Sequence, residues 1–236
     1  MIVNKVNNGW EIIFQRHHGL LAARLFSNLK SSLVHESVDR TALMAAIAEH
    51  DDGQRDWQEG NFVNDKGEPL DFTEYDYDLK HAKKAVIEAS YKSSYITLLI
   101  SRHITELYSQ AKTPSPELEQ YLAEQKEQQK ILLSYLSLSK KEFDQHYQLL
   151  RWCDELSLAL CKGQSSNNLP SLNPNGTQYK LARNEAFHIH PWPFCHDRLS
   201  IPLETYRLTQ NTFTSNEDLF RHLKKTSRTV REVVLR

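Results

Sequence analysis

The chain has 236 residues and a net charge of -1, since 29 Lys and Arg residues are matched by 30 Asp and Glu residues, so it offers no general attraction to nucleic acid or to an anionic membrane. Hydrophobic residues make up 39% and charged residues 25%, which is typical of a globular protein and excludes a disordered chain. No apolar run approaches the ~18 residues of a membrane span, and the start of the chain lacks a basic segment followed by a long apolar one. We therefore expect a cytoplasmic protein that has neither nucleic acid nor a membrane as its partner.

The spacing of apolar residues predicts a hairpin, a series of helices and then strands. Residues 1–14 are expected to form a β-hairpin, because two apolar runs flank an Asn-Asn-Gly turn. Helical periodicity then predicts helices over 15–29, 40–52, 77–91, 93–110, 114–138 and 140–162. Residues 163–176 are rich in Gly, Ser, Asn and Pro and are expected to form a loop. Strand-like alternation follows over 177–208, then a short helix after Ser215 and a last strand in "TVREVVLR".

These elements predict a single domain over 1–236 that is mostly α-helical with an α+β element. A helical bundle is expected over 15–162. The N-terminal hairpin and residues 177–236 are expected to form a β-rich subdomain, with a small antiparallel sheet beside the bundle. The cysteines are odd in number and have no CxxC spacing, so they predict neither a disulfide framework nor a zinc finger.

Ionisable side chains lie on the apolar faces of five predicted helices. In "TALMAAIAEHDDG", His50 continues the apolar stripe of Leu43 and Ile47, and Asp51 follows it directly. The same helical spacing turns four more such side chains inward: His18, His81, His103 and Asp154. One inward histidine is usually a structural core residue, but five coincidences favour a metal site, because a cation offsets the desolvation of its ligands.

The ordered set His, His-Asp, His, His, Asp resembles the HD-domain superfamily, helical metalloproteins named for an adjacent His-Asp pair, here His50-Asp51. The resemblance implies an HD-like helical bundle in which Asp51 bridges two metal ions. The ligands that it implies are His18, His50, Asp51, His81, His103 and Asp154. The finer pattern "QRHHGLLA", "HDDGQRDW", "PLDFTE", "RWCDELSLALC" and "PWPF" is similar to a bacterial family of unknown function that resembles a branch of this superfamily. That similarity does not indicate which reaction the protein would catalyse.

The resemblance implies a two-metal phosphohydrolase that acts on a small molecule or a nucleotide. Its cofactors would be two divalent transition-metal ions, with Fe or Mn favoured and Mg, Zn, Co or Ni as alternatives. Asp51 would be the central catalytic residue, and Arg55 and Lys84 are candidates to bind oxygens of a small anionic, phosphorylated substrate, with a solvated surface cation as the alternative for each. Two other functions stay open: a di-iron oxygenase of the HD type, and a non-catalytic metal-binding or sensing module. The oligomeric state is left open.

Two further groups of histidines are alternatives to members of this set. His17 and His18 are adjacent, but only His18 shares the apolar face of its helix, so His18 is the expected ligand. In "FHIHPWPFCH", His188 and His190 lie on one face of a strand, with a cysteine and a histidine just beyond them. Because Pro-Trp-Pro is stiff and bulky, a rigid edge or lid is favoured there over a zinc site.

Overall fold

The computed structural model describes residues 1–53, 60–75, 78–172 and 176–236. In chain order its helices are α1 (Gln15–Ser27), α2 (Arg40–Glu49), α3 (Leu79–Ser90), α4 (Ser94–Tyr108), α5 (Pro116–Tyr135), α6 (Lys140–Lys162) and α7 (Asn216–Lys225). Its strands are β1 (Ile2–Val6), β2 (Gly9–Ile13), β3 (Ser166–Leu169), β4 (Tyr179–Arg183), β5 (Phe187–His190), β6 (Leu199–Leu208) and β7 (Arg228–Leu235). Two single-turn 3-10 helices, Ser31–Leu33 and Phe72–Glu74, lie in the connections.

Local side-chain hydrogen bonds fix the ends of the helices that matter for the site. Ser139 and Glu142 form a capping box at the start of α6, and Gly163 ends that helix with a φ of 64°. α2 ends at Glu49, earlier than the predicted 40–52. His50 explains the early end, because its Nδ1 donates to the carbonyl oxygen of Ile47 at 2.7 Å and so competes for the acceptor that another helical turn would use.

The strands form one seven-stranded sheet in the order β1-β2-β6-β7-β5-β4-β3. Neighbouring strands are antiparallel except β5 and β7, which are parallel and pair Phe187 with Leu235. The expected HD-like helical bundle with a small antiparallel sheet is therefore wrong, because a large mixed sheet unites the N-terminal hairpin with every C-terminal strand in an α/β fold. The predicted loop over 163–176 is also partly wrong, since β3 pairs there with β4 at the sheet edge.

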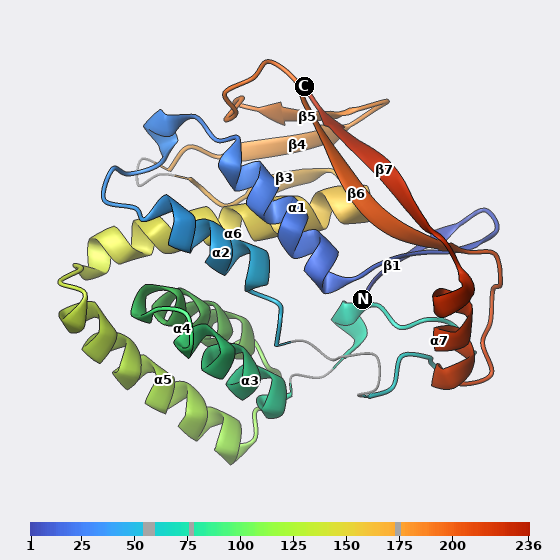
Figure 1. Cartoon of the computed structure of the whole chain (residues 1–236), viewed down its shortest axis with the longest axis horizontal. Helices are drawn as coiled ribbons and strands as arrows, with labels where there is room; N and C mark the ends of the chain where they lie inside the picture. The colour runs from blue at the N-terminus through green and yellow to red at the C-terminus, as the bar shows by residue number, and fades with distance from the viewer. Residues whose placement is uncertain (54–59, 76–77, 173–175) are drawn as a thin grey trace.

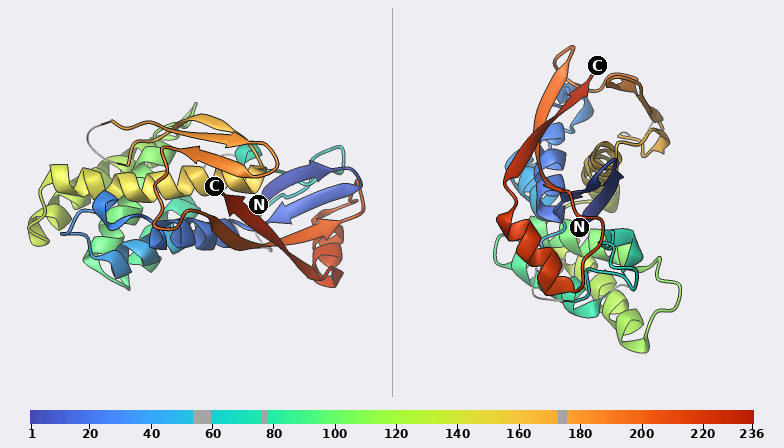
Figure 2. Two further views of the ribbon diagram at one scale, coloured as in Figure 1. Left: turned by 90° about the horizontal axis from the view of Figure 1, so that it is seen from above. Right: turned by 90° about the vertical axis from the view of Figure 1, so that its right-hand side faces the viewer.

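The sheet curls around α6, which is visible end-on in the right view of Figure 2. Trp152 of α6 is fully buried and packs edge-on against Tyr179 of β4, with ring centroids 5.4 Å apart. α1 lies between α6 and β6, while α2 to α5 pack on the side of α1 and α6 away from β3 to β5 (Figure 1). The sheet thus covers one side of the helical group. The centre of that group lies between α1, α2, α4 and α6.

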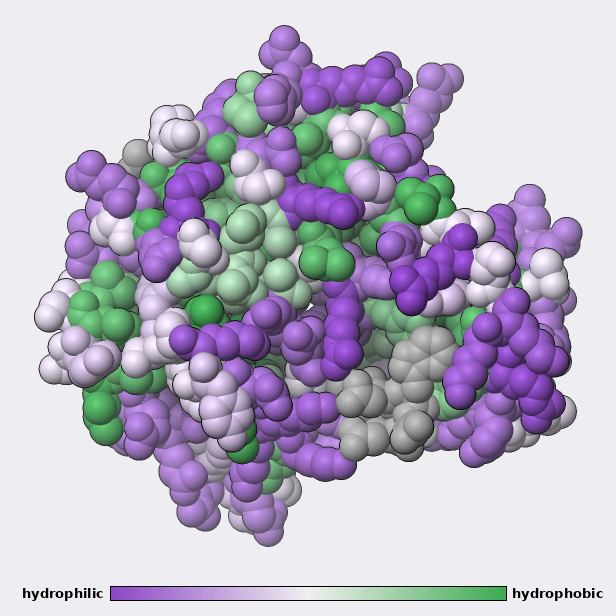
Figure 3. All heavy atoms as spheres, in the orientation of Figure 1, coloured by the Kyte–Doolittle hydropathy of each residue, from purple (hydrophilic) through white to green (hydrophobic). Residues whose placement is uncertain are grey.

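Figure 3 shows a face that is mostly hydrophilic, with apolar side chains gathered over α1 and α2. Leu20 and Met44 are the large exposed hydrophobic residues of these two helices. Among the described residues, no helix is both long enough and apolar enough to cross a membrane.

Gly19 allows α1 to pack closely on α2. A Cβ atom added at Gly19 would lie 2.3 Å from the carbonyl oxygen of Ala48. That oxygen belongs to helical backbone, so it cannot turn aside as a flexible side chain would. The close approach places His18, the residue before Gly19, next to His50 at the end of α2.

We predict that Gly19→Ala lowers the free energy of unfolding by about 1–3 kcal/mol, because the two helices must separate to admit the methyl group. Urea denaturation of the metal-free protein measures this change. Leu20→Ala is the matched control, since Leu20 is 51% exposed and its truncation should change the free energy by less than ~0.5 kcal/mol. Equal effects of the two substitutions would contradict the close contact.

Candidate metal centre

Three helices and the turn after α2 bring ionisable side chains together in the interior. α1, α4 and α6, with this turn, contribute five residues: His18, His50, Asp51, His103 and Asp154. The three imidazoles are buried, and the side chains of the two carboxylates are 11% and 13% exposed. We refer to these five residues as the His-Asp cluster.

Four atoms that commonly bind metals lie close together within the His-Asp cluster. His18 Nε2 lies 3.1 Å from His50 Nε2, 3.1 Å from Asp51 Oδ2 and 3.5 Å from Asp154 Oδ1. His50 Nε2 lies 3.2 Å from Asp154 Oδ1 and 3.7 Å from Asp51 Oδ2. Donor atoms that share one ion at ~2.1 Å are ~3.0–3.4 Å apart in octahedral or tetrahedral geometry. Three of these separations lie in that range and the other two, 3.5 and 3.7 Å, are slightly longer, so a small shift would let the four atoms share a single ion.

Hydrogen bonds behind the two imidazoles determine which ring nitrogens carry protons. His50 Nδ1 lies 2.7 Å from the carbonyl oxygen of Ile47, which can only accept, so Nδ1 is protonated. His18 Nδ1 lies 2.7 Å from Ser157 Oγ, and Ser157 donates its own hydrogen to the carbonyl oxygen of Asp154 at 2.8 Å. Ser157 therefore accepts from His18, and the Nε2 atoms of both imidazoles direct lone pairs into the cluster.

Lone pairs at these distances repel one another unless a positive charge lies among them. In the metal-free protein a proton on His50 supplies this positive charge. Burial lowers the pKa of His50, but the charges of Asp51 and Asp154 outweigh the effect of burial and raise that pKa to about 10. Burial likewise opposes ionisation of the two carboxyls, but the charge of His50 dominates and lowers the pKa of both. Two carboxylates and one imidazolium leave one buried negative charge, which a divalent cation in place of the proton would balance.

His103 reaches the cluster from α4. Its ring lies edge-on to that of His50, with centroids 5.0 Å apart. Burial, together with the neighbouring charge of His50, lowers the pKa of His103, so its ring is neutral at neutral pH. Its Nδ1 is buried and has no hydrogen-bond partner among the described residues. A neutral imidazole with an unpartnered nitrogen beside this cluster suits a further metal donor.

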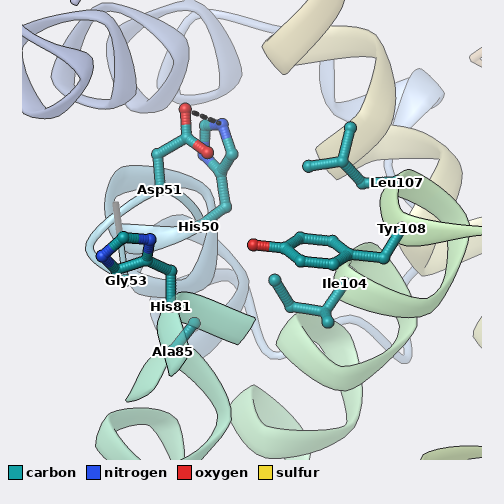
Figure 4. Close-up of a pocket in the computed structure, with 8 residues that line it drawn as sticks. All are labelled: His50, Asp51, Gly53, His81, Ala85, Ile104, Leu107 and Tyr108. Atoms are coloured by element: carbon teal, nitrogen blue, oxygen red, sulfur yellow. Dashed lines mark ion pairs between the residues drawn. The ribbon is translucent and has the colours of Figure 1, made fainter. Parts of the chain in front are cut away.

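A small pocket opens beside the cluster, and His50 and Asp51 form part of its wall (Figure 4). The other lining residues are Gly53, His81, Ala85, Ile104, Leu107 and Tyr108. About 220 Å³ of space, part of it open to solvent, lies between these side chains. Asp51, His81 and the Tyr108 hydroxyl make one part of the wall polar, while Ile104 and Leu107 make another apolar. The enclosed space between the polar and the apolar part of the wall is about that of one water molecule.

His81, the sixth expected ligand, lies on this pocket wall and is not part of the His-Asp cluster. It is 6% exposed, and its Nδ1 lies 3.2 Å from Asp78 Oδ2. Asp78 also caps α3, and its carbonyl oxygen accepts from the Tyr108 hydroxyl at 3.2 Å. Because the Asp78 carboxylate can only accept, Nδ1 carries the hydrogen between them, which leaves Nε2 as the nitrogen of His81 that can offer a lone pair.

Of the two residues expected to bind substrate oxygens, the structure describes only Lys84. Arg55 lies outside the described residues. Lys84 is half-buried one turn after His81 and is not among the residues that line the pocket. Asp52, next to Asp51, instead forms an ion pair with Arg16 at 3.5 Å, and its side chain is 35% exposed. Of the two adjacent aspartates, Asp51 alone joins the cluster.

The competing histidines are separate from the cluster. His17 turns away from His18 and lies with Nδ1 3.2 Å from the carbonyl oxygen of Glu204 in β6. His188 and His190 are exposed on one face of β5, and no group of three metal-binding side chains forms around them in the described parts of the chain. The segment that follows is anchored by Phe194, which is 1% exposed.

Three residues that support the site were not anticipated from the sequence. Ser157 fixes the tautomer of His18, and Asp78 orients His81. Gln15 Nε2 donates to Asp51 Oδ2 at 3.1 Å. Helical spacing carried a partial signal for two of them, since Gln15 lies three residues before His18 and Ser157 three residues after Asp154, each on the same helix face as its neighbour.

Comparison with known proteins identifies a family. A family model described as "Protein of unknown function (DUF3891)" matches residues 1–210. No significant match to a curated protein or to a solved structure was found. The expected relationship to the HD-domain superfamily is wrong, because the matching family is DUF3891 and the chain folds around a large curled mixed sheet instead of an HD-like helical bundle.

Proposed function

Since the chain belongs to the DUF3891 family, whose function is unknown, we propose a function from the site itself, that of a metal-dependent hydrolase that cleaves a phosphoester of a small molecule or nucleotide. The observation that carries the proposal is the approach of four lone-pair atoms, from His18, His50, Asp51 and Asp154, to separations of 3.1–3.7 Å. No arrangement of the protons on these four side chains gives every close pair a hydrogen bond, whereas one cation among them would attract all four atoms.

Imidazole and carboxylate donors together suit first-row divalent ions, so iron or manganese is favoured, with Mg, Zn, Co and Ni as alternatives. A divalent ion held by such donors supplies Lewis acidity towards a phosphoryl oxygen and lowers the pKa of a water molecule towards neutrality. Asp51 and Asp154 balance the charge of the ion. Ser157 and Ile47 keep the two imidazoles in the donor tautomer.

The pocket beside the cluster supplies the remaining parts of a hydrolytic site. His81, oriented by Asp78, can accept a proton from an attacking water molecule through the lone pair on Nε2. Ile104 and Leu107 form a wall that keeps water from the apolar part of a small substrate. The small size of the pocket supports a small phosphoester more than a polymer.

The site could instead hold two ions. In that case His81 and the second carboxylate oxygen of Asp51 would hold the second ion. We favour one tightly bound ion, because the two groups of metal-binding side chains share His50 and His81 belongs to neither. Native mass spectrometry of the wild type and of His81→Ala counts the ions. One ion in both proteins supports our choice, and a loss from two ions to one supports the two-ion form.

The hydrolase is tested with a panel of small phosphomonoesters and phosphodiesters, assayed with protein loaded with Mn²⁺ or Fe²⁺. We expect phosphate or alcohol release by the wild type and by Asp52→Asn, and none by Asp51→Asn. No turnover across the panel by metal-loaded protein would contradict the hydrolase. Dioxygen consumption by the iron-loaded protein without ester cleavage would favour the oxygenase alternative instead.

Metal binding should release about one proton per ion near pH 7.5, because the pKa of His50 in the metal-free protein is about 10. The raised pKa means that protons compete with the ion below pH 10, so affinity should rise about tenfold per pH unit between pH 7 and 9. Calorimetric titration with Mn²⁺ in buffers of different ionisation enthalpy measures the released proton. An affinity that does not change with pH would show that the ion binds elsewhere.

A further inference from the structure

Gln15 is a buried polar residue next to the His-Asp cluster. It is the first residue of α1, one turn before His18, and is 7% exposed. Its Nε2 donates to Asp51 Oδ2 at 3.1 Å, the same oxygen that lies 3.1 Å from His18 Nε2. Gln15 therefore contacts the cluster through the atom of Asp51 that faces the proposed ion.

The orientation of the Gln15 amide follows from its partner. A carboxylate oxygen can only accept, so the NH₂ group must face Asp51, because the flipped amide would place two oxygens against each other. The amide oxygen then needs a donor other than Asp51. This Oε1 atom is buried and has no hydrogen-bond partner among the described residues.

Buried carbonyl oxygens are rarely left without a donor, and an exception beside a candidate site points to a missing group. The missing donor to Oε1 can be a water molecule, or a hydroxyl or amine of a ligand. A phosphoryl oxygen without a proton cannot, since it offers no hydrogen. A water molecule that enters the site with the ion satisfies the requirement without any further protein group.

We propose that Gln15 is a positioning residue with two roles. Through Nε2 it holds Asp51 Oδ2 in the orientation that binds the ion, and through Oε1 it accepts a hydrogen bond from a water molecule beside that ion. The inference rests on the proposed metal-dependent function, but it concerns metal affinity and water position, so it is testable without a known substrate. Outer-shell partners of this kind typically change metal affinity about 10–100-fold.

The test compares Gln15→Met with Gln129→Met by Mn²⁺ titration. Gln129 is a matched control, because it is also 7% exposed and donates to Ser101 and Thr105 away from the cluster. We expect Gln15→Met to weaken Mn²⁺ binding about 10–100-fold with little change in the melting temperature of the metal-free protein. Gln129→Met should lower that melting temperature and leave Mn²⁺ affinity unchanged.

Equal Mn²⁺ affinities of the wild type and a folded Gln15→Met would overturn the positioning role. Failure of the wild type to bind Mn²⁺ or Fe²⁺ would instead overturn the proposed function, so the two failures are distinguishable. A crystal structure of the Mn²⁺-loaded wild type tests the second role and does not depend on any variant. We expect an ordered water ~2.7–3.2 Å from Gln15 Oε1. An Oε1 atom with no ordered water at that distance would overturn the second role.

Discussion

Asp51→Asn should abolish metal binding and any hydrolysis while the protein stays folded. Asparagine keeps the shape of the side chain but removes the negative charge that lies 3.1 Å from His18 Nε2 and 3.7 Å from His50 Nε2. Removing one charged partner from a buried set typically costs about 3–5 kcal/mol, which corresponds to a loss of affinity on the order of 10³-fold. Calorimetric titration with Mn²⁺ measures the affinity, and circular dichroism reports whether the fold is retained.

Asp52→Asn is the control for this prediction, because it makes the same chemical change one residue later. Asp52 pairs with Arg16 at the surface of the site instead of facing the cluster. Its replacement should leave Mn²⁺ affinity within about twofold of the wild type, since partly exposed ion pairs contribute little. The opposite result, with Asp52→Asn losing the ion and Asp51→Asn retaining it, would show that the cluster has been assigned to the wrong aspartate.

His18→Ala should remove most of the thermal stabilisation that a bound ion provides. At an ion concentration about 100 times the dissociation constant, binding stabilises the folded protein by about 2.7 kcal/mol, or roughly 5–10 °C for a chain of this size. Loss of one imidazole should weaken binding on the order of 100-fold. At the same Mn²⁺ concentration the increase in melting temperature should then fall to roughly 1 °C.

His17→Ala tests whether the effect belongs to the cluster or to this part of α1 in general. His17 faces β6, where it stacks on Tyr206 with ring centroids 6.4 Å apart. The variant should show the full response to Mn²⁺, even if its metal-free melting temperature changes. Equal responses to Mn²⁺ in His17→Ala and His18→Ala would contradict the assignment of His18 as a donor. Differential scanning fluorimetry with and without a chelator is sufficient for both variants.

Helical periodicity predicted most of the helices, because the buried face of a helix is encoded within the helix itself. α6 was predicted over 140–162 and forms over Lys140–Lys162, where a capping box and a left-handed glycine add local signals to the apolar stripe. The end of α2 was predicted less well. There a side chain, His50, competes for a backbone acceptor, and periodicity does not record such competition.

The sheet could not be predicted to the same degree, because strand pairing is non-local. The individual strands of the C-terminal third were recognisable from their alternation. Their joining to the hairpin through β6, and the parallel contact of β5 with β7, depend on how the sheet curls around α6. β3 has a polar sequence, "SNNL", and forms through backbone pairing at a sheet edge, so composition alone indicated a loop.

Helical phase identified the inward side chains but not their distances from one another. It placed His81 and His103 on buried faces, and both are buried. Helical phase gives the face of the helix on which a residue lies. It does not show how far along the helix that residue lies from the point where the helix crosses its neighbouring helices. For this reason His103 reaches the cluster while His81 lies on the adjacent pocket wall. The only signal for Gln15 was its spacing of three residues from His18, since a glutamine at a helix start is ordinary.

The metal content of the protein tests the central claim most directly. The protein should be purified without a metal-affinity tag, and its metals should be quantified by inductively coupled plasma mass spectrometry beside Asp51→Asn and Asp52→Asn. The account predicts at least one first-row transition-metal ion per chain in the wild type and in Asp52→Asn, and a large loss in Asp51→Asn. A wild-type protein that contains no such ion, and that binds none when Mn²⁺ or Fe²⁺ is added, would contradict it.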